Sequence, residues 1–151
     1  MQLSYWEKDR FFENIDIVII GSGIVGLFAA LHLKKKDQNL KIAVLESGPL
    51  PSGASTKNAG FACFGSMTEL MEDAAINGED AMLRLVEKRF KGLLSLREIL
   101  GDNNIGYQPL GGYEVFSKDD LSAFENCEEN INKYNQLLKD IIGGSVFNVS
   151  Q

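Results

Sequence analysis

Three glycines at fixed spacing follow a short run of β-branched residues near the start of the chain. Gly21, Gly23 and Gly26 give the pattern G-x-G-x-x-G. They come directly after Ile17–Ile20, which we expect to be a parallel strand buried on both faces. In a strand–turn–helix unit the first glycine makes the tight turn, the second lets a pyrophosphate approach, and the third lets the helix lie close to the strand. The pattern therefore predicts a phosphate-binding turn.

A helix, a second strand and an acidic residue follow the turn. We expect the helix to begin at about Ile24, where its dipole favours an anion. Lys41–Leu45 predicts a second apolar strand, and Glu46 follows Gly26 by twenty residues. A carboxylate at that distance can accept hydrogen bonds from both hydroxyls of an adenosine ribose and disfavours a 2′-phosphate. We therefore predict a dinucleotide-binding βαβ unit. If the glycines served packing alone, Gly26 would be explained, but Gly23 and Glu46 together would not.

A long loop of small residues, Ser47–Phe64, comes next. Its prolines and glycines disfavour regular structure, and long loops in compact domains are usually functional. Gly53–Thr56 and Asn58–Gly60 can bring N–H and hydroxyl groups to an anion. We expect the apolar side chains of Phe61–Phe64 to tie the far end of the loop to the core. The alternative is a flexible surface loop.

Helical periodicity and capping pairs dominate the rest of the chain. Ser66 with Glu69, and Ser117 with Asp120, have the spacing of helix caps. We predict helices over about 66–76, 79–100 and 118–142, and extended strands over 107–110, 112–116 and 146–149. This order supplies only two parallel strands of a nucleotide-binding unit, which normally has at least three. We therefore expect the sequence to be the front part of a longer one.

Composition limits the remaining classes. The net charge of −6 argues against a nucleic-acid partner. No apolar stretch approaches the ~20 residues of a transmembrane helix, and the charged first residues do not fit a signal peptide. Cys63 and Cys127 are too few for a disulfide scaffold or a metal site, so we expect no metal and a cytoplasmic location. The aromatic segment Leu3–Phe12 is expected to pack against the body.

At IDIVIIGSGIVG, followed by VLESGPLPSGASTKNAGFACFGS, the chain resembles the D-amino-acid oxidase and glycine oxidase-like family of FAD-dependent oxidoreductases. The resemblance implies FAD as cofactor, with the strand–turn–helix binding its ADP half and Glu46 holding the ribose. It also implies that Gly53–Gly60 runs along the cofactor toward the isoalloxazine ring. The implied cofactor-binding residues are Gly21, Ser22, Gly23, Ile24, Val25, Gly26, Glu46, Ser47, Gly53, Ala54, Ser55, Thr56, Lys57, Asn58, Ala59, Gly60 and Phe61.

The implied fold is α/β: a Rossmann-type FAD-binding βαβ unit, then helices and the start of a second α+β substrate layer, incomplete relative to the family. We expect an N-terminal aromatic segment over 1–14, an FAD-binding domain over 15–106 and the start of a substrate-binding domain over 107–151. Gly111-Gly112-Tyr113 would be the entry into that second domain.

The resemblance implies oxidation of an amine or amino acid by hydride transfer to flavin N5. No residue here is then expected to be a catalytic acid or base, since the protein supplies position and electrostatics. Ser4-Tyr5-Trp6 is similar to members that oxidise polyamine derivatives. We expect Cys63 to be a buried thiol near the ring rather than a flavin attachment point.

Family members are longer than this chain. We therefore expect these 151 residues alone to be inactive, to hold FAD weakly and to self-associate through uncovered surfaces. The alternative function is a nucleotide-binding or interaction module without redox activity.

Overall fold

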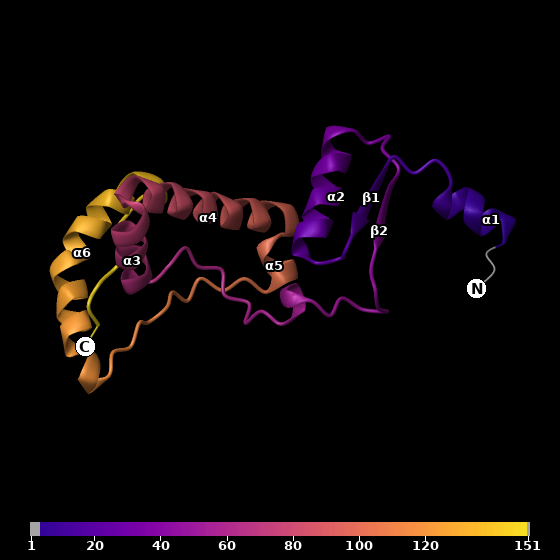
Figure 1. Cartoon of the computed structure of the whole chain (residues 1–151). Coiled ribbons are helices and arrows are strands. Elements are labelled where there is room, and N and C mark those ends of the chain that lie inside the picture. The colour runs from indigo at the N-terminus through magenta and orange to yellow at the C-terminus, as the bar shows by residue number, and fades with distance from the viewer. Residues whose placement is uncertain (1–3, 151) are drawn as a thin grey trace. The chain divides into compact units, whose positions relative to one another are not determined.

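The computed structural model describes residues 4–150, which divide into two compact units between Phe61 and Ala62 (Figure 1). Residues 1–3 and 151 lie outside the described residues. The start of the predicted aromatic segment, including Leu3, and the last residue of the predicted substrate domain fall on them. The predicted domain boundary at residue 107 stays a prediction.

The first unit is built on a parallel βαβ arrangement. Its elements are β1 (Ile17–Ile20), α2 (Ile24–Lys36) and β2 (Ile42–Leu45). The strands pair in parallel, with Ile17 opposite Ile42 and Ile20 opposite Leu45. Helix α2 packs beside both strands, as Figure 1 shows. The predicted strand–turn–helix–strand order and the mixed α/β class are confirmed.

One face of β1 is open, which corrects the prediction of a strand buried on both faces. Ile17 and Ile19 are half-buried, whereas the exposed fractions of Val18 and Ile20 are 52% and 88%. Helix α2 covers the first face, and no described element of this unit covers the second. The continuous β-branched run therefore predicted the strand correctly but not its burial.

The N-terminal segment is helical and exposed. It forms α1 (Tyr5–Glu7), followed by a π-helical turn over Lys8–Phe12. Ser4 and Glu7 make a reciprocal capping box, because each side chain bonds the backbone N–H of the other. The aromatic side chains are exposed, Trp6 by 70%, so the expectation that this segment packs against the body is wrong.

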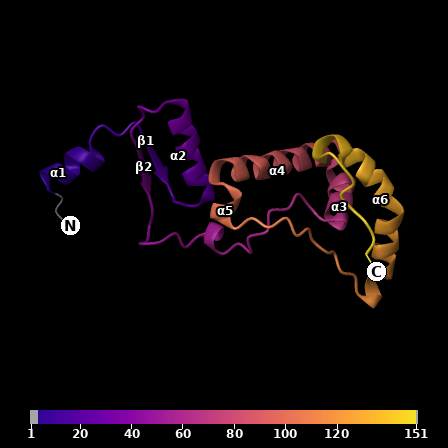
Figure 2. The same cartoon turned by 180° about the vertical axis from the view of Figure 1, so that it is seen from behind.

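The second unit is a helical assembly. Its helices are α3 (Met67–Asn77), α4 (Glu79–Leu100), α5 (Asp102–Ile105) and α6 (Leu121–Ile142), with a 3-10 turn over Lys118–Asp120. Helix α3 packs against both α4 and α6 (Figure 2). Their buried side chains are Met67, Leu70, Met82, Val86, Cys127, Tyr134 and Leu138. The three long predicted helices are confirmed, while α5 was not predicted.

The three predicted strands of this part are not formed in the described residues. After α6, the backbone at Val146 and Phe147 is hydrogen-bonded to the side chain of Asn135, and not to a neighbouring strand. Asn135 Oδ1 accepts from the N–H groups of Val146 and Phe147 at 2.8 and 2.9 Å, and Asn135 Nδ2 donates to the Phe147 carbonyl at 2.9 Å. Over residues 4–150, no helix is both long and apolar enough to cross a membrane.

Candidate functional site

The turn after β1 depends on two of its glycines for its shape. Gly21 has φ +96°, a left-handed conformation that favours glycine, and its N–H donates to the Leu45 carbonyl at 2.7 Å. A Cβ on Gly26 would lie 2.1 Å from the Gly21 carbonyl oxygen. The close approach of α2 to the end of β1 is therefore possible only with glycine at position 26.

The carboxylate of Glu46 lies against the same turn, immediately after β2. Glu46 Oε2 accepts from the N–H and the hydroxyl of Ser22, both at 2.8 Å. Glu46 Oε1 accepts from the N–H and the hydroxyl of Ser47 at 3.0 and 3.1 Å. The bonds from the Ser22 backbone, the Ser22 hydroxyl and then Ser47 lower the pKa of Glu46 from 4.5 to about 2. The group is an anion with its acceptor positions filled.

The start of α2 is bonded from the loop after β2. Gly23 is the N-cap and has no side chain, and the N–H of Ile24 donates to the hydroxyl of Ser55 at 3.0 Å. Among the described residues, the N–H groups of Val25 and Gly26 have no acceptor. No acidic residue lies in the first turn of this helix. Free N–H groups at a helix start, next to a residue without a side chain, suit the phosphates of a dinucleotide.

The loop brings only some of its predicted residues to the turn. Ala54–Thr56 forms a 3-10 turn that begins after Gly53 and carries Ser55 to α2. Lys57–Phe61 is exposed, and no residue in it is hydrogen-bonded to the glycine turn in the part of the chain that the structure describes. This second stretch of predicted site residues is therefore not joined to the first.

The far end of the loop corrects two expectations. Phe64 packs against the helical core as predicted, but Phe61 is 84% exposed. Cys63 is exposed rather than buried, while Cys127 is the buried thiol. Within Phe61–Phe64, Phe64 is the described residue whose side chain packs against the core of the second unit.

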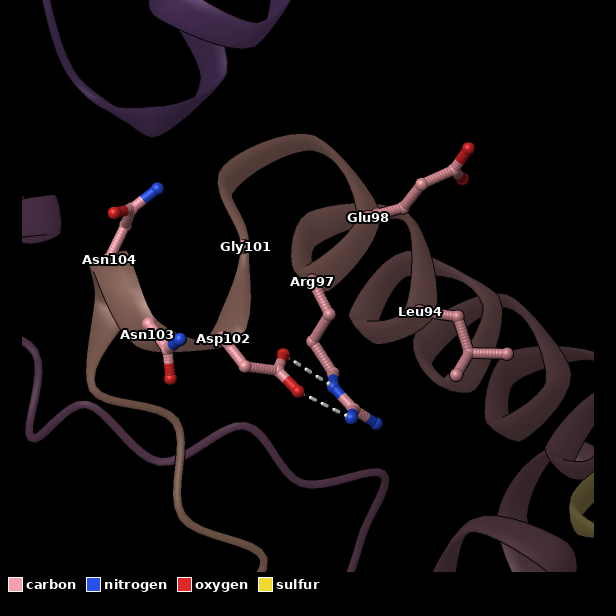
Figure 3. Close-up of a pocket in the computed structure, with 7 residues that line it drawn as sticks. All are labelled: Leu94, Arg97, Glu98, Gly101, Asp102, Asn103 and Asn104. Atoms are coloured by element: carbon pink, nitrogen blue, oxygen red, sulfur yellow. Dashed lines mark hydrogen bonds and ion pairs between the residues drawn. The ribbon is translucent and has the colours of Figure 1, made fainter.

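A shallow pocket lies elsewhere, at the end of α4, and contains none of the predicted site residues (Figure 3). Arg97 Nε and Nη2 bond both oxygens of Asp102 at 2.9 and 2.7 Å, and these bonds lower the pKa of Asp102. The Arg97 guanidinium also lies 4.3 Å from the centre of the Tyr107 ring. Since the ion pair is satisfied within the chain, it closes the turn after Gly101 and offers little to a ligand.

A second carboxylate contact, at the start of α3, was not predicted from the sequence. Glu114 accepts from the N–H groups of Met67 and Thr68 at 3.1 and 3.3 Å and from the hydroxyls of Ser66 and Thr68. Glu114 is 46 to 48 residues away along the chain, so no local spacing could reveal it. This contact holds the extended segment 112–116 against α3.

A parallel βαβ unit with a glycine turn, free N–H groups at the helix start and an acid after the second strand defines a dinucleotide-binding protein. The model of the family described as FAD dependent oxidoreductase matches residues 16–142. The chain therefore belongs to the FAD dependent oxidoreductase family, and its cofactor is FAD.

Two kinds of curated relative match the chain, an oxidoreductase and thiamine thiazole synthases. Gamma-glutamylputrescine oxidoreductase of Escherichia coli (strain K12) is 28% identical over 134 residues, which are 86% of this chain and 31% of that protein. Thiamine thiazole synthase of Yarrowia lipolytica (strain CLIB 122 / E 150) is 44% identical over 52 residues, covering 30% of this chain and 16% of that protein. The same enzyme of Candida albicans (strain WO-1) is 49% identical over 47 residues, covering 31% and 13%.

The chain spans about a third or less of the length of these relatives. No solved structure matches it.

Proposed function

We propose that the first unit binds the ADP half of FAD at the glycine turn and Glu46. The N–H groups at the start of α2 would hold the pyrophosphate, and Glu46 would accept hydrogen bonds from the ribose. Gly53–Phe61 would follow the cofactor toward its ring. In this proposal 15–106 belongs to the FAD-binding domain and 107–151 begins a substrate-binding domain.

We further propose that the whole enzyme oxidises an amine or amino acid. When bound, the flavin supplies a hydride acceptor at N5 for the carbon that bears the substrate nitrogen. A relative named for gamma-glutamylputrescine supports an amine substrate, because putrescine is a diamine. The residues of this chain would bind and orient the cofactor, and none is assigned a proton transfer.

The observation that carries the proposal is the meeting of three sequence-distant groups at one turn. Ser22 in the turn is bonded to Glu46, 24 residues later, and Ile24 is bonded to Ser55, 31 residues later. These hydrogen bonds connect the glycine turn to the acid proposed for the ribose and to the loop of small residues. The N–H groups proposed for the phosphates lie at the same turn. A βαβ unit whose glycines served packing alone would not need this arrangement.

Equilibrium titration of the chain with FAD, and separately with NAD+, tests the proposal. FAD should bind in preference to NAD+, because the loop has the length and the small residues to follow a flavin dinucleotide. Gly23→Val should abolish FAD binding, since a Cβ there already lies 3.0 Å from Ser55 Oγ and the added methyl groups would occupy the phosphate position. Gly144→Val is the matched control, because a Cβ on Gly144 meets nothing within 4 Å.

Two results would contradict the proposed site. One is tight NAD+ binding without FAD binding. The other is unchanged FAD affinity in a folded Gly23→Val chain.

The second candidate function is a nucleotide-binding or interaction module without redox activity. The observation that favours it is apolar surface exposed on the first unit, where the side chains of Ile20, Val25 and Phe61 are each 84–88% exposed. Such surfaces commonly mark protein contacts, and we propose that the chain self-associates through them. Mass in solution, bound flavin and amine oxidation should be measured on one sample.

We expect the chain to self-associate, to hold FAD weakly and not to oxidise amines on its own. A monomer that retains stoichiometric FAD and oxidises an amine would refute this part of the proposal. We also propose a cytoplasmic location, based on the low cysteine content.

A further inference from the structure

The four hydrogen bonds at Glu46 come from two kinds of donor. Backbone N–H groups of Ser22 and Ser47 donate at 2.8 and 3.0 Å, and the hydroxyls of the same serines donate at 2.8 and 3.1 Å. Each carboxylate oxygen receives one bond of each kind. A carboxylate has about four acceptor positions, so a further donor can bind only by replacing one already present.

The hydroxyls are the donors that can leave. A backbone N–H moves only when the chain around it changes conformation, whereas a serine hydroxyl turns away by rotation about χ1 to another staggered position. Their departure opens one acceptor position on each oxygen of Glu46. An adenosine ribose carries two neighbouring hydroxyls, so the number of positions matches the number of donors.

We propose that the hydroxyls of Ser22 and Ser47 are internal substitutes for the two ribose hydroxyls. Ribose binding at Glu46 is then an exchange, in which two ribose donors replace two serine donors while both backbone bonds remain. This inference rests on the proposed FAD site and names two residues that set its affinity. The serines keep the carboxylate oriented without nucleotide, and they weaken nucleotide binding by competing for its acceptor.

The two serines should compete unequally. The Ser22 hydroxyl bonds Glu46 at 2.8 Å, a usual distance for this kind of bond, whereas the Ser47 hydroxyl is at the longer 3.1 Å. Removing the Ser22 hydroxyl should therefore have the larger effect. A water molecule that fills the vacated position is not tethered to the chain and returns to the solvent when the ribose arrives.

Titration calorimetry of the full chain with ADP and with FAD tests the exchange. Ser22→Ala should bind both ligands roughly three- to tenfold more tightly than the wild type, by the usual net strength of one hydrogen bond. Ser47→Ala should gain less. Ser22→Thr retains the hydroxyl and should stay close to the wild type.

A matched ligand isolates the ribose contact. The analogue 2′,3′-dideoxy-ADP has no ribose hydroxyls, so it cannot use the positions that Ser22→Ala frees. The affinity gain of Ser22→Ala should therefore vanish with this analogue, while the phosphate contacts stay the same. A gain that persists with the dideoxy analogue would contradict the exchange.

A second measurement needs no ligand. An NMR titration of the Glu46 side-chain carbon should give a higher pKa in Ser22→Ala than in the wild type, because one bond to the charged form is lost. An unchanged pKa would show that the hydroxyl does not bond Glu46 in solution and would overturn the inference.

Failure of the inference can be told apart from failure of the site. If the wild type binds neither ADP nor FAD, or if Glu46→Gln leaves the affinity unchanged, the proposed FAD site fails and the exchange fails with it. If the wild type binds through Glu46 but Ser22→Ala binds ADP equally or less tightly, the exchange alone is wrong.

Discussion

The hydroxyl of Ser55 accepts a hydrogen bond from the backbone N–H of Ile24 at 3.0 Å, across 31 residues of sequence. The N-cap residue of α2, Gly23, has no side chain that could make this bond. Ser55 therefore does for α2 what a serine or aspartate at the N-cap does for other helices. The loop after β2 and the helix after β1 are held together at the turn where the phosphates are proposed to bind.

Ser55→Ala should loosen the first turn of α2. Loss of a helix cap costs about 0.5–2 kcal/mol, and the Ile24 amide would lose its acceptor. Hydrogen exchange measured by NMR should show the Ile24 amide exchanging several-fold faster than in the wild type, with Ser55→Thr close to the wild type. Equal protection in Ser55→Ala would mean that another group caps the helix.

Gly26→Ala should unfold the first unit or destabilise it by more than about 3 kcal/mol. The added Cβ would lie 2.1 Å from the Gly21 carbonyl oxygen, so the helix would have to move away from the turn. The same substitution at Gly92, inside α4, is the control. A Cβ at Gly92 meets nothing, and Gly92→Ala should stabilise α4 by about 0.5–1 kcal/mol.

Urea unfolding of both variants, with NMR signals from each unit, gives this comparison. A Gly26→Ala chain with a native first unit would contradict the close approach of α2 to the turn.

Glu114→Gln should free the extended segment 112–116 from α3. The substitution removes the charge that accepts bonds from the backbone of Met67 and Thr68 at the positive end of the helix. The free energy of unfolding of the second unit should fall by about 1–2 kcal/mol in urea titrations followed by circular dichroism. Glu87→Gln, which breaks an exposed i,i+4 pair with Lys91, should cost about 0.5 kcal/mol or less. Equal effects of the two variants would count against the Glu114 contact.

The folding of the first unit should depend on pH through Glu46. Its pKa is about 2 in the folded chain, against an ordinary value of 4.5, because Ser22 and Ser47 bond the charged form. The stabilisation is therefore complete above pH 4.5 and is lost as the pH falls through about 2. NMR titration of the Glu46 carboxyl in the folded chain should give a midpoint well below 4.5. A midpoint near 4.5 would show that these hydrogen bonds are absent in solution.

Local signals in the sequence predicted most of the helices. The capping box of Ser66 and Glu69 opens α3 as expected, and α4 ends at Leu100, before Gly101. The same S-x-x-E signal occurs at Ser4 and Glu7, where it starts a helix that the sequence reading missed. Helix ends depend on neighbours three or four residues away, and for this reason they can be read from the sequence.

Contacts between distant residues could not be predicted in this way. The position of Glu46 in the sequence predicts a ribose acceptor. That position did not indicate the hydrogen bonds from Ser22 and Ser47 to Glu46. The predicted strand 146–149 failed for a related reason. A strand needs a partner strand, and in the described part of this chain Asn135 bonds the backbone there instead.

Equilibrium titration of FAD into the wild type and into Glu46→Gln tests the central claim, that the turn and Glu46 form the FAD site. Each ribose hydrogen bond to a charged acceptor contributes about 1.5–3 kcal/mol, less the serine bond that it replaces, so Glu46→Gln should weaken FAD binding by at least about tenfold. Glu13→Gln, an exposed carboxylate of the same unit, serves as the control and should bind FAD like the wild type. Equal FAD affinity in the wild type and in a folded Glu46→Gln chain would contradict the account.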